Sequence, residues 1–148
     1  MKLLSIFFLS FLLTGNAWLL DFSEAKFIAQ KENKHILISF SGSDWCGPCI
    51  LMHKEILDQS AFINYAKDHL VLVKADFPRL KKNQLSPEQL KKNNDLALKY
   101  NPEGDFPLTV LTDAEGKVIH IWSGFPGGTS EEFVKQVADT IQKNALKK

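Results

Sequence analysis

The sequence predicts an α/β fold in which helices flank a central mixed β-sheet on both faces. Amphipathic and short apolar segments follow one another in the order helix, strand, helix, strand, helix, strand, strand, helix. The early strands are separated by helices and should run parallel, whereas the turn TDAEGK joins the last two into an antiparallel hairpin. With 148 residues, of which 45% are hydrophobic and 24% charged, the chain suits one globular domain.

The first half of the chain should supply one helix and two buried strands. Asp21–Asn33 places apolar side chains at helical spacing, and the residues WLL before it could add a short edge strand. His35–Phe40 and Leu70–Asp76 are short apolar runs typical of buried strands. Between these strands, helices are expected over Pro48–Leu57 and Ser60–His69.

The second half begins with a polar, lysine-rich insertion, FPRLKKNQL, before the third helix. Ser86 should cap that helix, with Pro87 at its first position and the Gln89 side chain reaching back to the cap. The hairpin strands are expected over 106–111 and 118–122. Thr129 and Glu132 have the spacing of a second capping box, which predicts a last helix to about Lys143.

The N-terminus has the pattern of a secretory signal. Lys2 precedes an apolar run over Leu3–Leu13, and small residues follow. The run is about half of the roughly 20 residues that span a bilayer, so cleavage after Ala17 is expected and an uncleaved membrane anchor is the alternative. The predicted organisation is therefore a signal peptide over 1–17 and one domain over 18–148.

The run SDWCGPCI contains both cysteines, Cys46 and Cys49, at a strand-to-helix junction. Side chains three apart on a helix share a face, so this pair can close and open a disulfide with little backbone motion. A helix N-terminus favours the nucleophilic thiolate. We expect Cys46, at the exposed mouth of the helix, to attack a disulfide and Cys49, one turn in, to resolve the mixed disulfide. Gly47 would let a substrate chain come close, and Pro48 would stiffen the turn.

Other uses of the cysteine pair fit the sequence less well. A disulfide across so short a loop constrains the unfolded chain little. A zinc site needs about four ligands, and the histidines lack the usual spacing. Haem attachment needs a histidine directly after the second cysteine, where Ile50 stands. The spacing thus favours a redox couple without metal or organic cofactor, and a net charge of +1 gives no reason to expect nucleic-acid binding.

The motif WCGPC, after a buried strand and before a helix, resembles the active site of the thioredoxin family. The resemblance covers nearly the whole mature chain and includes Pro107, the turn TDAEGKV and Gly124. SGSDWCGPC and DFPRLKKNQLSPEQL are also similar to exported bacterial thioredoxin-like proteins. The resemblance implies a thioredoxin fold with an inserted polar loop before the third helix. It also implies that Trp45 shields the cysteines and lines a substrate groove, and that Phe106 and Pro107, joined by a cis bond, present backbone to an incoming peptide.

One feature departs from the family pattern. Thioredoxins usually bury an aspartate on the strand before the motif and a lysine on the next strand, where they move protons at the resolving cysteine. Lys74 matches the lysine, but Ser39 stands at the aspartate's place, and Asp44 is expected to face solvent. Lys74, water or Glu55 are therefore the candidates for proton transfer with Cys49.

Several other residues are expected to be ordinary. His53 is interpreted as a solvated helix histidine, and Trp122 and Phe125 as core or as the rim of the substrate groove. Four lysines are interpreted as a solvated face, with an acidic partner as the alternative: Lys81, Lys82, Lys91 and Lys92.

The sequence thus predicts a periplasmic or secreted thiol–disulfide oxidoreductase. The Gly-Pro dipeptide resembles that of reducing members, which favours a disulfide reductase. A disulfide oxidase or isomerase is the alternative among enzymes, and a non-catalytic binding module is the alternative outside them. The expected partners are protein disulfide substrates and a membrane or soluble redox protein that resets the cysteines, and the enzyme is expected to be a monomer.

Overall fold

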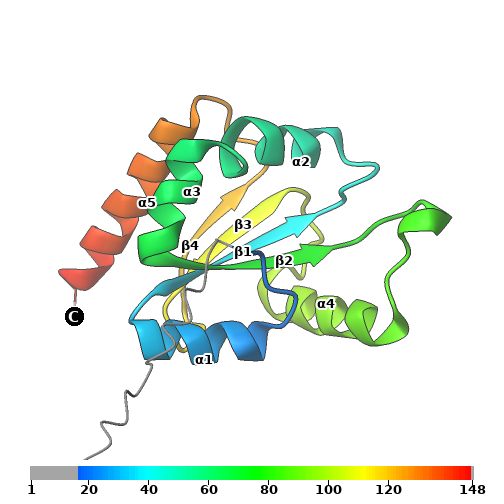
Figure 1. Ribbon diagram of the computed structural model, residues 1–148, viewed down its shortest axis with the longest axis horizontal. Helices are drawn as coiled ribbons and strands as arrows, with labels where there is room; N and C mark the ends of the chain where they lie inside the picture. Colours follow the sequence, from blue (N-terminus) through cyan, green and yellow to red (C-terminus); the bar gives the residue numbers. More distant parts are fainter. Residues whose placement is uncertain (1–16, 148) are drawn as a thin grey trace, which may run out of the picture.

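The computed structural model describes residues 17–147, and they form one mixed β-sheet between two layers of helices (Figure 1). The four strands lie in the order β2-β1-β3-β4. β1 runs parallel to β2 and antiparallel to β3, and β3 and β4 form the expected antiparallel hairpin. The strands are β1 His35–Ser41, β2 Leu70–Asp76, β3 Leu108–Thr112 and β4 Val118–Ser123.

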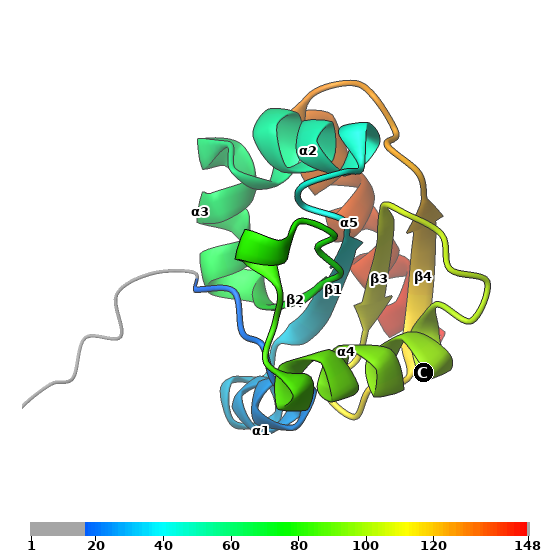
Figure 2. The ribbon, with the colours of Figure 1, turned by 90° about the vertical axis from the view of Figure 1, so that its right-hand side faces the viewer.

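The helices divide between the two faces of the sheet (Figures 1 and 2). One face carries α1 and α4, and the other carries α2, α3 and α5. The α-helices are α1 Phe22–Glu32, α2 Gly47–Met52, α3 Ser60–His69, α4 Pro87–Tyr100 and α5 Ser130–Ala145. Two short helical segments join them, the π-helix η1 His53–Leu57 and the 3-10 helix η2 Lys81–Asn83. The predicted mixed sheet with helices on both faces is confirmed.

Alternation along β1 separates the two hydrophobic cores. Successive side chains of a strand point to opposite faces of the sheet. Ile36 and Phe40 therefore pack with α1 and α4, whereas Leu37 packs with Met52 and with Phe133 of α5. The same alternation decides which polar residues near the end of β1 lie on the face that carries α2.

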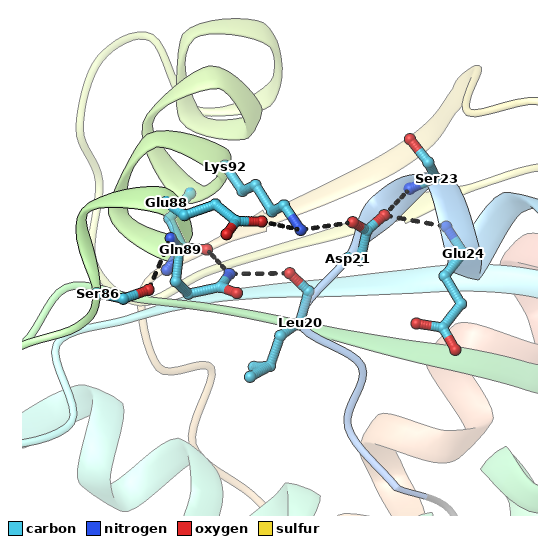
Figure 3. A network of polar contacts seen from close by, with 9 residues as sticks. Leu20, Asp21, Ser23, Glu24, Ser86, Glu88, Gln89 and Lys92 are labelled. Carbon is cyan, nitrogen blue, oxygen red and sulfur yellow. Dashed lines mark hydrogen bonds and ion pairs between the residues drawn. The ribbon is translucent and has the colours of Figure 1, made fainter.

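A polar network joins α4 to the start of α1 (Figure 3). The Asp21 carboxylate caps α1 and pairs with Lys92 at 3.0 Å. Gln89 donates through its side-chain amide to the Leu20 carbonyl at 2.9 Å. The expected contact from Gln89 back to its own N-cap is therefore wrong, because its amide is engaged elsewhere, although Ser86 does cap α4. Lys92 links the two helices through exposed ion pairs, and its side chain is solvent-exposed as expected.

Other local predictions can be compared with the structure directly. The capping box of Thr129 and Glu132 opens α5 as expected, and Leu19 forms an isolated parallel bridge with Val73 at the sheet edge. The predicted helix after the cysteines changes to π geometry at His53.

Apart from Ala17, the predicted signal peptide lies outside the described residues. Within 17–147, no helix is both long and apolar enough to cross a membrane.

Candidate active site

The two cysteines lie where β1 passes into α2. Cys46 is the N-cap of α2, and Cys49 lies in its first turn with Pro48 at the helix start. They form a disulfide with a Cα–Cα distance of 5.2 Å. The backbone N–H of Cys49 donates to Cys46 Sγ at 3.3 Å, so the helix start directs a hydrogen-bond donor at the first sulfur. A donor in this position stabilises a thiolate.

Both sulfur-bearing residues are shielded in the disulfide form. Cys46 is 5% exposed and Cys49 is fully buried. The expected order of accessibility is therefore confirmed, but the expectation that Cys46 lies at an exposed helix mouth is wrong for the oxidised protein. Open space lies beside Gly47 instead, where a built Cβ would meet no atom within 4 Å.

The loop before the cysteines is joined to the loop after β2 by hydrogen bonds. Both loops follow parallel neighbouring strands, so they leave the sheet at the same edge. The Ser43 hydroxyl donates to Asp76 Oδ2 at 2.5 Å and the Ser43 N–H to Oδ1 at 2.9 Å. Trp45 Nε1 donates to the Phe77 carbonyl at 2.7 Å. The second loop thus positions the motif.

Asp44 is the main anchor of the inserted loop. Its carboxylate accepts from the backbone N–H of Arg79 at 2.9 Å, from that of Leu80 at 3.0 Å and from the Asn83 amide at 2.9 Å. These donors, led by the Arg79 N–H, hold the pKa of Asp44 below its ordinary value. Asp44 is partly exposed, as expected, but its carboxylate also holds the inserted loop. These contacts join residues some 35 positions apart in the chain, so a local pattern could not reveal them.

Three aromatic rings cluster beside the cysteine motif, on the side that we call the front. Trp45 and Phe77 each meet the ring of Phe106 edge-on, at centroid distances of 5.5 Å. Phe106 and Pro107 are joined by the expected cis peptide bond, and Pro107 is buried. A Cβ on Gly42 would overlap the Trp45 ring, so only glycine lets the indole lie in this position. The structure thus brings Trp45 and Phe106 together, with Gly47 open beside the cysteines.

The other side of the disulfide, which we call the back, lies between α2 and the sheet. Ser39 and Lys74 are register partners on β1 and β2, and strand alternation places both on the face that carries α2. Ser39 is buried and Lys74 half-buried, and Lys74 lines a cavity of about 340 Å³ with Ile50 and His53. The Ser39 position provides no carboxylate here. Glu55, the third candidate for proton transfer, is exposed and pairs with Lys54, so it does not belong to the back.

His53 is an unexpected member of the back. Its side chain is only 19% exposed, so its interpretation as a solvated histidine is wrong. It packs against Trp18 with a ring-centroid distance of 5.5 Å, and its Nδ1 lies 3.6 Å from the Asp58 carboxylate. Burial is the main cause that holds the pKa of His53 below its ordinary value; Lys74 lowers it further, whereas Asp58 raises it. Its Nε2 is buried without a hydrogen-bond partner among the described residues.

The aromatic residues near the hairpin end belong to the core of the face that carries α5. Trp122 meets Phe133 at 5.3 Å and donates to Gln136, and Phe125 packs on the same cluster. The core interpretation of Trp122 and Phe125 is therefore favoured over the groove rim. The Gly124 N–H donates to the Pro107 carbonyl at 2.8 Å, which fixes the cis-proline segment to the hairpin.

Comparison with known proteins agrees with this geometry. A family model described as a thioredoxin-like domain matches residues 22–141. The chain belongs to the thioredoxin family. The Cys46–Cys49 pair is the redox pair of this thiol–disulfide oxidoreductase.

Two related proteins and one solved structure illustrate the match. The disulfide bond reductase DsbH of Chlamydia pneumoniae is 40% identical over 127 residues, which are 86% of this chain and 71% of DsbH. A solved structure of a DsbH oxidoreductase has a TM-score of 0.78 at 36% identity, covering 87% of this chain and 86% of that one. The thioredoxin-related protein DsbJ of Chlamydia pneumoniae is 28% identical over 130 residues, and the match spans 87% of this chain but 36% of DsbJ.

Proposed function

We propose that this thioredoxin-family protein is an exported disulfide reductase in which Cys46 attacks and Cys49 resolves. The observation that carries this proposal is the Cys46–Cys49 pair at the start of α2, where a backbone N–H donates to Cys46 Sγ at 3.3 Å. The name of the relative DsbH, a disulfide bond reductase, supports the reducing direction. The Gly-Pro dipeptide between the cysteines supports it as well.

The reaction begins with the reduced protein. The Cys46 thiolate attacks one sulfur of a substrate disulfide, forms a mixed disulfide and releases the other substrate sulfur as a thiolate that takes up a proton. Cys49 then loses its proton and attacks Cys46 Sγ, which releases the second substrate thiol. Two electrons pass to the substrate, and the enzyme is left with the Cys46–Cys49 disulfide.

The front provides the substrate-binding residues in this proposal. Trp45 and Phe106 offer an aromatic surface next to Cys46. The cis Phe106–Pro107 segment presents the Phe106 backbone to an extended substrate segment, since the Pro107 carbonyl is already bonded to the Gly124 N–H. The open space beside Gly47 admits the substrate chain, while Pro48 fixes the start of α2. These contacts would hold the substrate sulfur in line with Cys46 Sγ.

The back provides the route for the proton of Cys49. Lys74 lies on the sheet face beneath α2 and lines a cavity with Ile50, the residue after Cys49. With serine at position 39, Lys74 and water in this cavity are the groups that would carry the proton. We expect resolution by Cys49 to depend more on pH than it would with a buried carboxylate at that position.

Export and partners follow from the N-terminal pattern and the cysteine chemistry. A cleaved leader would deliver the domain to the periplasm or outside the cell, where protein disulfides persist. Each turnover leaves the enzyme oxidised, so a membrane or soluble redox protein must reduce the Cys46–Cys49 disulfide again. The substrates would be disulfide-bonded proteins in the same compartment.

The reduction potential tests the proposed direction. The oxidised protein would be equilibrated with glutathione or dithiothreitol buffers and the thiol fraction measured by mass spectrometry after alkylation. A reductase should have a potential near that of thioredoxin, about −270 mV, and should reduce insulin with dithiothreitol as electron source. A potential near about −120 mV would identify an oxidase instead. An inactive Cys46→Ser variant that kept the full biological effect would identify a binding module.

A further inference from the structure

A hollow of about 470 Å³ lies beside the motif, between the front and the inserted loop. Its walls include the rings of Trp45, Phe77 and Phe106, together with Arg79, Gln84 and Leu90. Trp45 precedes the attacking cysteine and Phe106 precedes the cis-proline. A substrate segment held at Cys46 would therefore pass next to this hollow.

The wall formed by the inserted loop is fixed in place. Asp44 holds the backbone N–H groups of Arg79 and Leu80, and the Gln84 amide donates to the carbonyls of Pro78 and Arg79 at 3.3 and 3.2 Å. Trp45 is hydrogen-bonded to Phe77 at the base of the same loop. A substrate would meet a preformed surface here.

Among the described residues that line this hollow, Arg79 is the single charged one. Its guanidinium Cζ lies 3.7 Å from the centre of the Trp45 ring, where the aromatic face holds the cation. Among residues 17–147, no carboxylate forms an ion pair with it. Asp44 directs its oxygens to the loop amides, and Asp105, which precedes Phe106, accepts from the Ser123 hydroxyl. The hollow thus combines an apolar floor with a cation that has no ion-pair partner among the described residues.

We propose that this hollow binds the part of a substrate protein that flanks its reactive cysteine, and that Arg79 selects substrates with an acidic and an apolar residue there. The inference rests on the proposed function and adds a substrate class to it. The apolar side chain would contact Trp45 and Phe106. The carboxylate would take a charge-assisted hydrogen bond from the guanidinium, whose planar fork suits it. Lys81 and Lys82 on η2 are exposed and add positive charge to the same loop.

The test compares three peptides that contain the same disulfide and differ in one flanking residue. Aspartate, asparagine or lysine would precede a phenylalanine next to the cysteine, and kcat/KM for reduction would be measured for each. The wild-type enzyme should prefer the aspartate peptide to the lysine peptide by roughly three- to ten-fold, the range between an exposed ion pair and a charge-assisted bond. The preference should shrink as salt is added.

Two variants separate this explanation from a general effect of charge. Arg79→Gln should bring the ratio between the aspartate and lysine peptides close to one. Any effect of Arg79 on the reactivity of Cys46 changes kcat/KM for both peptides alike, so it cancels in this ratio. The matched control is Lys26→Gln, because Lys26 also lies over an aromatic ring, 5.6 Å from the centre of Phe22, but on α1, which covers the opposite face from α2 (Figure 1). Lys26→Gln should keep the wild-type ratio.

The outcomes separate this inference from the proposed function. A ratio close to one in the wild-type enzyme, or an unchanged ratio in Arg79→Gln, would overturn the inference while a small neutral disulfide is still reduced. If the wild-type protein reduced neither the peptides nor the small disulfide, the proposed function would be overturned and the inference with it. A ratio that is lost in Arg79→Gln and kept in Lys26→Gln supports the inference.

Discussion

The front and the back of the disulfide are lined by different kinds of residue. The front presents aromatic rings, open space at Gly47 and the cation of Arg79 to solvent. The back encloses polar groups, among them Ser39, Lys74 and His53, between α2 and the sheet. An aromatic, open surface is suited to binding substrate chains, whereas buried polar groups are suited to controlling protons. The comparison suggests that substrate choice and proton transfer can be altered separately.

Substitutions of the two cysteines should give the largest effects on activity, because each cysteine has its own step in the proposed reaction. Cys46→Ser removes the nucleophile and should lower insulin reduction by roughly a thousandfold or more. Cys49→Ser should stop turnover as well, but it leaves the attack intact, so mixed disulfides should accumulate. Non-reducing electrophoresis and mass spectrometry of trapped substrate would measure this. Equal trapping by both variants would contradict the assigned roles.

Two glycines test the architecture of the front. Gly42→Ala places a Cβ into the Trp45 ring and should destabilise the protein by about 1–3 kcal/mol, as overpacking does. Gly47→Ala meets no neighbouring atom and should change the free energy of unfolding by less than about 0.5 kcal/mol. Gly47→Ala should nevertheless slow reduction of insulin more than that of a small disulfide. Urea unfolding and the two assays measure these effects, and equal stability losses would refute the packing argument.

A carboxylate introduced at the back should alter the proton step alone. Ser39→Asp would place an acid opposite Lys74 and should speed resolution of the mixed disulfide at pH 6 by about tenfold, less than a full general base supplies. Ser39→Asn is the matched control, since it adds similar volume without an acid. The decay of the mixed disulfide would be followed by stopped-flow fluorescence between pH 5 and 9. An unchanged pH profile in Ser39→Asp would count against proton transfer at this position.

His53 should give the smallest effect, and its sign follows from its lowered pKa. Burial disfavours the charged imidazole, so the unfolded chain takes up the proton first as pH falls below about 6.5. Stability from neutral His53 is therefore present above this pH and is lost as pH falls toward the lower pKa of the folded state. His53→Gln should reduce the loss of thermal stability between pH 7.5 and 5.5. His120→Gln, at an exposed position of β4, should not, and equal changes in both variants would contradict the assignment.

Much of the front and of the sheet could be predicted because the signals are local. The run from Leu70 to Asp76 is a strand with the expected bounds, and the spacing of Cys46 and Cys49 indicated their disulfide. The contacts of Asp44 could not be predicted, because its partners lie on a loop that only the parallel pairing of β1 and β2 brings close. The burial of His53 likewise depends on Trp18 and on the packing of β2, which helical periodicity does not report.

The central claim is that the Cys46 thiol is ionised and reachable while the Cys49 thiol is withheld. The most direct measurement is the rate of iodoacetamide alkylation at each cysteine of the reduced protein between pH 4 and 10, followed by mass spectrometry. Cys46 should react with a pKa well below the value of about 8.5 for a free cysteine, and Cys49 should react far more slowly. A Cys46 that titrates like free cysteine, or equal reaction of both sulfurs, would contradict the account.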